Sequence, residues 1–145
     1  MYSLALNEDA LGQILRQLKR FIKARVQSAN ARGAVVALSG GIDSSVVAAL
    51  AHDVVNTKAL ILPEKGVTSE QDMLDATSIA EAYNLSFTII DINDLINCFK
   101  ESAKPILPAH TLDQLSIAEA NLKPRIRMAL NYVASNAERL SLIHI

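Results

Sequence analysis

Cysteine, tryptophan and other aromatic residues are scarce in this sequence. Its 145 residues include one cysteine, Cys98, and no tryptophan. An internal disulfide framework and a cysteine-rich zinc site are therefore excluded. The three histidines, His52, His110 and His144, do not have the spacing of metal ligands. Because aromatic residues make up 4% of a chain that is 50% hydrophobic, the sequence predicts an aliphatic core.

An excess of one charge and long apolar runs are also absent. The formal net charge is −1, which argues against a protein that coats nucleic acid. No apolar run approaches the roughly 20 residues that a helix needs to cross a bilayer. The first residues lack the basic segment and apolar stretch of a secretory signal. We therefore expect a cytoplasmic protein that binds neither nucleic acid nor membranes.

The most informative segment is Ser39 to Ser44, which reads Ser-Gly-Gly-Ile-Asp-Ser between apolar runs at 34–38 and 46–51. This order predicts a strand, a glycine-rich turn and the start of a helix. Glycine allows the tight turn, and the first turn of a helix presents unpaired N–H groups at the positive end of its dipole. The segment therefore predicts a site for an anion such as phosphate.

Three serines, at positions 39, 44 and 45, add hydroxyl donors to this turn. The segment matches neither G-x-x-x-x-G-K-[ST] nor G-x-G-x-x-G, so it is a phosphate-binding loop of another type, without a lysine. A simpler alternative is an ordinary turn in which Asp43 or Ser44 caps the helix.

Hydrophobic periodicity predicts strands that alternate with helices. The predicted elements are a lead-in helix at 7–29, strands at 34–39, 58–62 and 85–92, helices that begin near 42, 69 and 93, a last helix at 121–139, and the start of a fourth strand at 140–145. We interpret Lys104 to His110 as a loop or lid, and we place Pro124 in the first turn of the last helix.

This alternation indicates an α/β fold, a doubly wound parallel sheet with helices on both faces. We expect one domain over residues 1–145, with a lead-in helix at 1–30 and a nucleotide-binding core at 34–145. Ligands of such sheets bind beyond the carboxyl ends of the strands. The loops at 39–44 and 63–66 should therefore flank one pocket.

Ser-Gly-Gly-x-Asp-Ser resembles the pyrophosphatase loop of the ATP-pyrophosphatase superfamily, whose members cleave ATP between the α and β phosphates. A second segment, Asn121-Leu122-Lys123-Pro124-Arg125-Ile126-Arg127-Met128, narrows the resemblance. Together with Leu62-Pro63 and the stretch 68–72, it is similar to the NAD synthetase family over about residues 10–140. By itself, the pair Arg125 and Arg127 favours the solvated start of an amphipathic helix, and only together with the Ser39–Ser44 loop does it indicate the family.

The resemblance implies a fold like that of the adenine nucleotide alpha hydrolases. It also implies amidation of deamido-NAD to NAD with ammonia, through an adenylated intermediate, with release of AMP and pyrophosphate. ATP is the co-substrate and Mg²⁺ the cofactor, and the family works as a homodimer.

The resemblance also implies roles for individual residues. Arg125 would contact deamido-NAD and Asp43 would be a magnesium ligand, whereas Arg127 receives no role and no further catalytic residue is assigned. The residues that would bind ATP form one continuous stretch: Ala37, Leu38, Ser39, Gly40, Gly41, Ile42, Asp43 and Ser44.

Other functional residues of the family follow its fourth strand and have no counterpart before Ile145. We therefore expect that the C-terminal part of the fold is missing from this sequence and that the 145 residues by themselves lack part of the catalytic set. Two alternatives remain: another pyrophosphatase-loop ligase or thiolation enzyme, and a non-catalytic nucleotide-binding or dimerisation module.

Overall fold

Strands and helices alternate along the chain, as the periodicity predicts. The computed structural model describes residues 7–106 and 112–143, and for residues 112–115 it describes the backbone alone. The elements are α1 (Glu8–Ser28), β1 (Ala34–Leu38), α2 (Ile42–His52), β2 (Thr57–Ile61), α3 (Glu70–Ala82), β3 (Ser86–Ile89), α4 (Asn93–Ala103), the short 3-10 helix η1 (Lys104–Ile106), α5 (Leu112–Glu138) and β4 (Ser141–Ile143).

The strands form one parallel sheet in the order β3-β2-β1-β4. β1 is central: it pairs with β2 from Ala34↔Thr57 to Leu38↔Ile61 and with β4 from Ala34↔Ser141 to Val36↔Ile143. The chain moves outward from β1 to β3 and then returns to the other side of β1, so the strand order reverses beside β1. In doubly wound sheets, ligands bind at this position.

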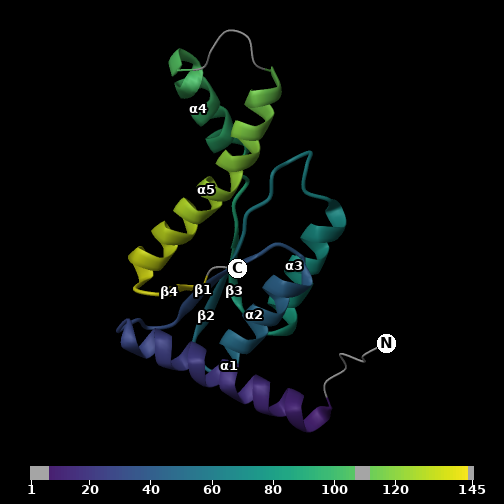
Figure 1. Cartoon of the computed structure of the whole chain (residues 1–145), viewed down its shortest axis with the longest axis vertical. Helices are drawn as coiled ribbons and strands as arrows, with labels where there is room; N and C mark the ends of the chain where they lie inside the picture. The colour runs from purple at the N-terminus through teal and green to yellow at the C-terminus, as the bar shows by residue number, and fades with distance from the viewer. Residues whose placement is uncertain (1–6, 107–111, 144–145) are drawn as a thin grey trace.

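Helices cover both faces of the sheet, which confirms the predicted fold class (Figure 1). Side chains alternate along β1, so Val36 and Leu38 pack with alanines of α2 and α3, whereas Val35 packs on the opposite face with α4 and α5. The small side chains of Ala48 and Ala76 are fully or almost fully buried at the first of these interfaces. The core is aliphatic, as predicted.

The last helix differs from its prediction. It begins at Leu112 instead of Asn121, so Pro124 lies inside the helix and not in its first turn. Proline has no N–H for the carbonyl four residues earlier, but a helix that is held elsewhere can contain it. The predicted buried stripe is correct for Ile126 but wrong for Val133, which is 66% exposed, and for Ala137, which is also exposed.

The predicted loop or lid at 104–110 also requires correction. Its first three residues form the 3-10 helix η1, and the others lie outside the described residues. Figure 1 shows α4 and the start of α5 side by side at one end of the molecule, above the sheet, with α1 at the opposite end.

The lead-in helix forms as predicted, but its apolar side remains largely uncovered. Asn7 caps it by accepting a hydrogen bond from the N–H of Ala10 at 2.8 Å. Val26 is buried, whereas Leu18 and Phe21 are 42% and 55% exposed. Like the other helices in the described ranges, α1 is not long and apolar enough to cross a membrane.

Candidate functional site

The turn between β1 and α2 leaves main-chain donors available. Gly41 occupies the N-cap position of α2, and within the described chain no side chain caps this helix. The N–H groups of the first helical turn, Ile42 to Ser44, have no acceptor within the helix. Gly41, Ile42 and Asp43 are exposed. This is the arrangement that binds an anion at a helix N-terminus.

Gly40 is required at its position for two reasons. Its φ of +85° lies in the region that favours glycine, and a Cβ atom would lie 2.4 Å from the carbonyl oxygen of Asp72 in α3. The backbone of the turn therefore packs directly on the first turn of α3, and no residue with a side chain fits without displacing one of the two.

The serine hydroxyls organise the turn. Ser44 is buried, and its Oγ donates to the carbonyl of Gly41 at 2.9 Å and accepts from the N–H of Ser39 at 3.2 Å. The Oγ of Ser45 donates to the same carbonyl at 2.9 Å. In this arrangement both hydroxyl protons are engaged within the loop, so binding of phosphate by Ser44 and Ser45 stays a prediction.

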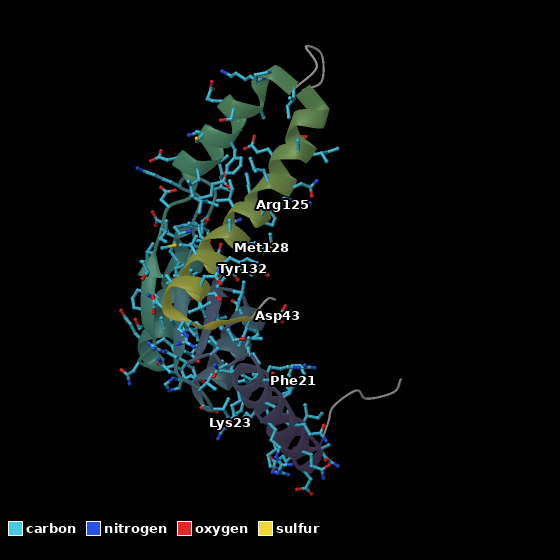
Figure 2. The ribbon with its side chains drawn as sticks, turned by 90° about the vertical axis from the view of Figure 1, so that its left-hand side faces the viewer. Phe21, Lys23, Asp43, Arg125, Met128 and Tyr132 are labelled. Carbon is cyan, nitrogen blue, oxygen red and sulfur yellow. The ribbon has the colours of Figure 1, made fainter. Side chains whose placement is uncertain are left out.

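A cavity of about 630 Å³ brings this turn together with α5. Ser39, Gly41 and Asp43 line one side, and Arg125 and Arg127 line the other. Figure 2 shows Arg125, Met128 and Tyr132 following one another along α5, with Asp43 of α2 beyond them. The two segments that carry the family resemblance are distant in the sequence but share one cavity in the fold.

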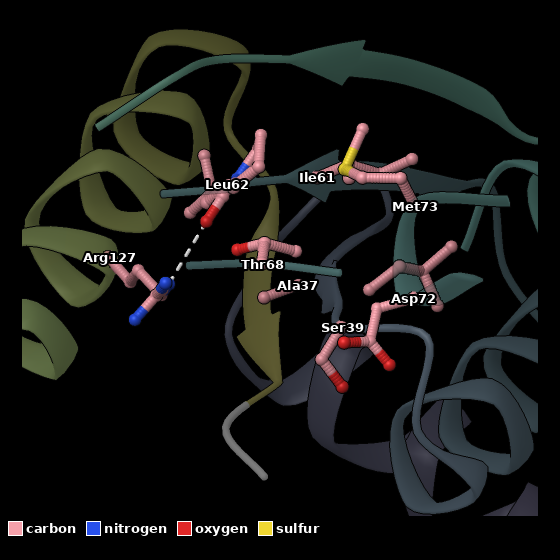
Figure 3. A pocket seen from close by; sticks show the side chains of 10 residues that line it. Ala37, Ser39, Ile61, Leu62, Thr68, Asp72, Met73 and Arg127 are labelled. Carbon is pink, nitrogen blue, oxygen red and sulfur yellow. Dashed lines mark hydrogen bonds between the residues drawn. The ribbon is translucent and has the colours of Figure 1, made fainter. Parts of the chain in front are cut away.

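A second, smaller cavity of about 230 Å³ opens between the ends of β1 and β2 (Figure 3). Its walls are mostly apolar and include Leu38, Ile61, Leu62 and Met73, with Thr68 and Asp72 as polar members. A cavity with apolar walls and a few polar groups is typical of a small-molecule site.

The prediction that the loops at 39–44 and 63–66 flank one pocket is correct only in part. Ser39 and Pro63 both line the smaller cavity. Lys65 and Gly66 instead line a separate hollow together with Asp91. Of the β2–α3 loop, Leu62, Pro63 and Thr68 line the smaller cavity, whereas Lys65 and Gly66 between them do not.

Two cations of α5, one helical turn apart, anchor the helix to the end of β2. The Nε of Arg127 donates to the carbonyl of Leu62 at 3.0 Å, and the Nζ of Lys123 lies 2.8 Å from the carboxylate of Glu64. Glu64 is buried, and its hydrogen bond raises the pKa of Lys123 above its ordinary value. These contacts set where α5 stands over the strand ends.

One residue of this site carries no expectation from the sequence, Asn131. Asn131 is 5% exposed and lines the larger cavity, and its Nδ2 donates to the carbonyl of Arg127 at 2.8 Å. Its amide oxygen is buried without a hydrogen-bond partner among the described residues. Asn131 follows Arg127 by four positions, so helical spacing from the arginines was the one signal that could have found it.

The match to a known family decides the affiliation. A family model described as NAD synthase matches residues 14–144. The chain belongs to the NAD synthase family. This confirms the resemblance drawn from the two motifs, which lie on facing walls of the larger cavity.

Curated relatives are consistent with this family. The chain is 42% identical to the NH(3)-dependent NAD(+) synthetase of Archaeoglobus fulgidus over 128 residues, which are 86% of this chain and 49% of the relative. It is 39% identical to the protein of the same name from Methanocaldococcus jannaschii over 137 residues, 91% of this chain and 50% of the relative. The chain therefore spans about half the length of the curated relatives that it matches.

Solved structures of NAD synthase relatives share the fold. The structure of NMN synthetase from Francisella tularensis has a TM-score of 0.81 at 28% identity. The match covers 90% of this chain and 52% of the Francisella chain. The NH3-dependent NAD synthetase from Campylobacter jejuni, in complex with nitrate, has a TM-score of 0.78 at 28% identity, over 90% of this chain and 54% of its own. These matches confirm the α/β architecture.

Proposed function

We propose that this chain forms the ATP-binding part of an ammonia-dependent NAD synthetase. The reaction would be amidation of deamido-NAD to NAD with ammonia, driven by cleavage of ATP to AMP and pyrophosphate. The observation that carries this proposal is the larger cavity, because it holds the uncapped β1–α2 turn and Arg125 on facing walls. The names of the curated relatives support the same activity.

The chemistry requires activation of a carboxylate, because a carboxylate is a poor electrophile and its oxygen a poor leaving group. Attack of the nicotinate carboxylate on the α-phosphorus of ATP releases pyrophosphate and gives a mixed anhydride, and ammonia then displaces AMP. Such phosphoryl transfer depends on positioning and charge stabilisation. We assign the positioning of ATP and the stabilisation of its phosphate charge to the stretch from Ala37 to Ser44. The main-chain N–H groups of this stretch in the first turn of α2 would face the phosphates.

Asp43 fits the proposed role of magnesium ligand. It is exposed in the first turn of α2 and lines the larger cavity beside the uncapped N–H groups. Magnesium in proteins is commonly held by one or two carboxylates together with phosphate oxygens and water. The ion would supply neutralisation of the developing phosphate charge.

Arg125 is proposed to contact deamido-NAD. It is exposed on α5 and lines the larger cavity, where a planar guanidinium can bind a carboxylate or phosphate through two hydrogen bonds. Because its side chain is exposed, replacement should not disturb folding. Any effect of Arg125→Gln on substrate binding should therefore be local.

A homodimer in the cytoplasm is part of the proposal. The exposed apolar residues Phe21 (55%), Ile42 (75%), Met128 (41%) and Val133 (66%) lie on α1, α2 and α5, and a second copy could cover them. Light scattering should then give twice the mass of one chain. Val133→Lys should reduce that mass if α5 contributes to the interface, and a monomeric wild-type protein would contradict the dimer.

The activity is tested by incubating the protein with deamido-NAD, ammonium, ATP and Mg²⁺. We expect AMP and NAD in equal amounts if the chain contains a complete site, and ADP as the product would reject the reaction. Titration calorimetry tests the binding part separately. Asp43→Asn should weaken ATP binding only when Mg²⁺ is present. Arg125→Gln should weaken the binding of deamido-NAD but not that of ATP.

The deamidated mononucleotide is the comparison acceptor, because one structurally similar protein is titled an NMN synthetase. ATP binding without release of AMP would restrict this chain to a nucleotide-binding module.

A further inference from the structure

Among the side chains of α5 that the structure describes, that of Arg127 alone lines both cavities of the site. The larger cavity and the smaller one share Ala37, Ser39 and Arg127 in their walls. Ala37 and Ser39 belong to the end of β1 and the turn after it, so the boundary between the cavities is formed by backbone on one side and a guanidinium on the other. A ligand that reaches from one cavity into the other must pass Arg127.

The guanidinium is held at this boundary by one of its nitrogens. Its Nε donates to the carbonyl of Leu62 at 3.0 Å, and Figure 3 shows the terminal nitrogens beyond this bond. Among the described residues, these terminal nitrogens form no hydrogen bond. An arginine anchored through Nε keeps a planar pair of donors in a fixed direction, which suits a phosphate.

The two cavities differ in the chemistry that they favour. The smaller one is enclosed largely by Leu38, Ile61, Leu62 and Met73, and the larger one contains the exposed carboxylate of Asp43. A molecule with a flat ring at one end and an anionic group at the other would place its ring in the smaller cavity. Its first anionic group would then lie at the boundary.

We infer that Arg127 binds the phosphate next to the nucleoside of ATP and so joins the base cavity to the cavity of the second substrate. This inference rests on the proposed function and adds a residue to it. The α-phosphate is the group that the acceptor attacks, so Arg127 would contact the reacting phosphorus centre through its oxygens. The positive charge would be worth more as that centre gains negative charge in the transition state.

A purely structural role is the alternative, because Arg127 also joins α5 to the end of β2. Lys123 provides the matched control. It contacts the same strand end through Glu64 at 2.8 Å, but it lines neither cavity. Loss of Lys123 should therefore weaken the same anchor without removing a donor from the boundary.

The experiment measures adenosine, AMP and ATP binding to the 145-residue chain by calorimetry, with Mg²⁺ for ATP. For the wild type we expect AMP to bind more tightly than adenosine. Arg127→Gln should weaken AMP binding about 10- to 100-fold and leave the affinity for adenosine within about twofold of the wild type. Lys123→Gln should lower the melting temperature but keep the ratio of AMP to adenosine affinity.

Arg127→Lys serves as a second variant, because it keeps the charge and loses the planar pair of donors. It should weaken AMP about three- to tenfold. Equal loss of adenosine and AMP in Arg127→Gln, or an unchanged AMP affinity in both Arg127 variants, would overturn the inference while leaving the proposed function intact. A wild-type chain that binds none of the three ligands would overturn the proposed function and the inference with it.

Discussion

Two neighbouring strand-to-helix junctions differ in whether a side chain caps the N-terminus of the helix. At the β2–α3 junction, residues 62–69, the Oγ of Ser69 caps α3 by accepting from the N–H of Asp72 at 3.0 Å. The Oγ1 of Thr68 also accepts from the N–H of Glu64 at 2.9 Å. At the β1–α2 junction, residues 39–45, Gly41 stands at the cap position and no side chain of the described chain replaces it.

The difference shows what distinguishes a binding turn from a connecting one. Both turns follow adjacent parallel strands and lead into helices, so their position in the fold does not explain why one helix is capped and the other is not. A helix whose first N–H groups are bound by its own cap has little left for a ligand, whereas an uncapped helix retains its donors and its dipole for an anion. The following predictions change one junction at a time.

The largest effect should come from Gly40→Ala. Alanine at a φ of +85° is strained, and its Cβ would meet the Asp72 carbonyl at 2.4 Å. Together these should lower the free energy of unfolding by about 3 kcal/mol and abolish ATP binding, because the turn must move away from α3. Urea denaturation and calorimetry measure the two effects.

Gly66→Ala is the matched control. Gly66 has a similar φ of +82°, but a Cβ there would have no atom within 4 Å. It should cost only the backbone strain, about 1 kcal/mol, with ATP binding unchanged. Equal costs for the two variants would show that the contact with Asp72 is unimportant.

Gly41→Asp should convert the binding junction into a capped one. Gly41 has a φ of −76°, which any residue adopts. The carboxylate of the introduced aspartate could accept hydrogen bonds from the N–H groups of the first turn. We expect slightly higher stability and a loss of ATP affinity of about 10- to 100-fold, since the carboxylate repels phosphate. Asparagine in Gly41→Asn can cap the helix without adding a charge, so this variant should lose less ATP affinity. Unchanged ATP affinity in both variants would contradict an anion site at the N-terminus of α2.

Ser69→Ala removes the cap of the connecting junction. The free energy of unfolding should fall by about 1 kcal/mol, because the N–H of Asp72 loses its acceptor. ATP affinity should stay within about twofold, since Ser69 lines neither of the two cavities. A loss of ATP binding without a loss of stability would place Ser69 in the site and remove the contrast between the junctions.

The smallest effect concerns the ion pairs that hold the β2–α3 junction to α5 and α4. Glu64 contacts Lys123, Lys123 lies 3.6 Å from Glu119, and Glu119 accepts from Lys100 at 2.8 Å. The hydrogen bond from Lys100 lowers the pKa of Glu119 below its ordinary value of 4.5. The stability from this pair is therefore present above pH 4.5 and is lost as the pH falls through the lowered pKa.

Lys100→Gln tests this dependence. It should destabilise the protein slightly at neutral pH, and the difference from wild type in chemical denaturation should vanish in acid, where Glu119 is protonated in both. The control is Lys104→Gln, because the Lys104–Glu101 pair is exposed on both sides and should contribute almost nothing. A difference for Lys100→Gln that persists in acid would mean that the side chain acts by packing and not by charge.

The elements near the β1–α2 junction could be predicted because their signals are local. The apolar run of β1 is buried from Ala34 to Val36, and the two glycines follow it directly. The predicted start of the last helix is wrong because Pro124 predicts a first helical turn, where proline is most common in helices, whereas α5 begins at Leu112. The turns before Pro124 are supported by contacts that lie far away in the sequence, such as the Lys100–Glu119 pair to α4.

The sequence by itself determined the parallel α/β sheet, the glycine turn and the family, because each depends on residues that are adjacent or regularly spaced along the chain. Only the tertiary structure decided that Arg125 and Asp43 share a cavity and that Arg127 reaches the carbonyl of Leu62. It also decided that Gly40 must be glycine because of Asp72. These facts join strands and helices that are distant in the chain, and the packing of helices on a twisted sheet sets such distances, whereas local propensity does not.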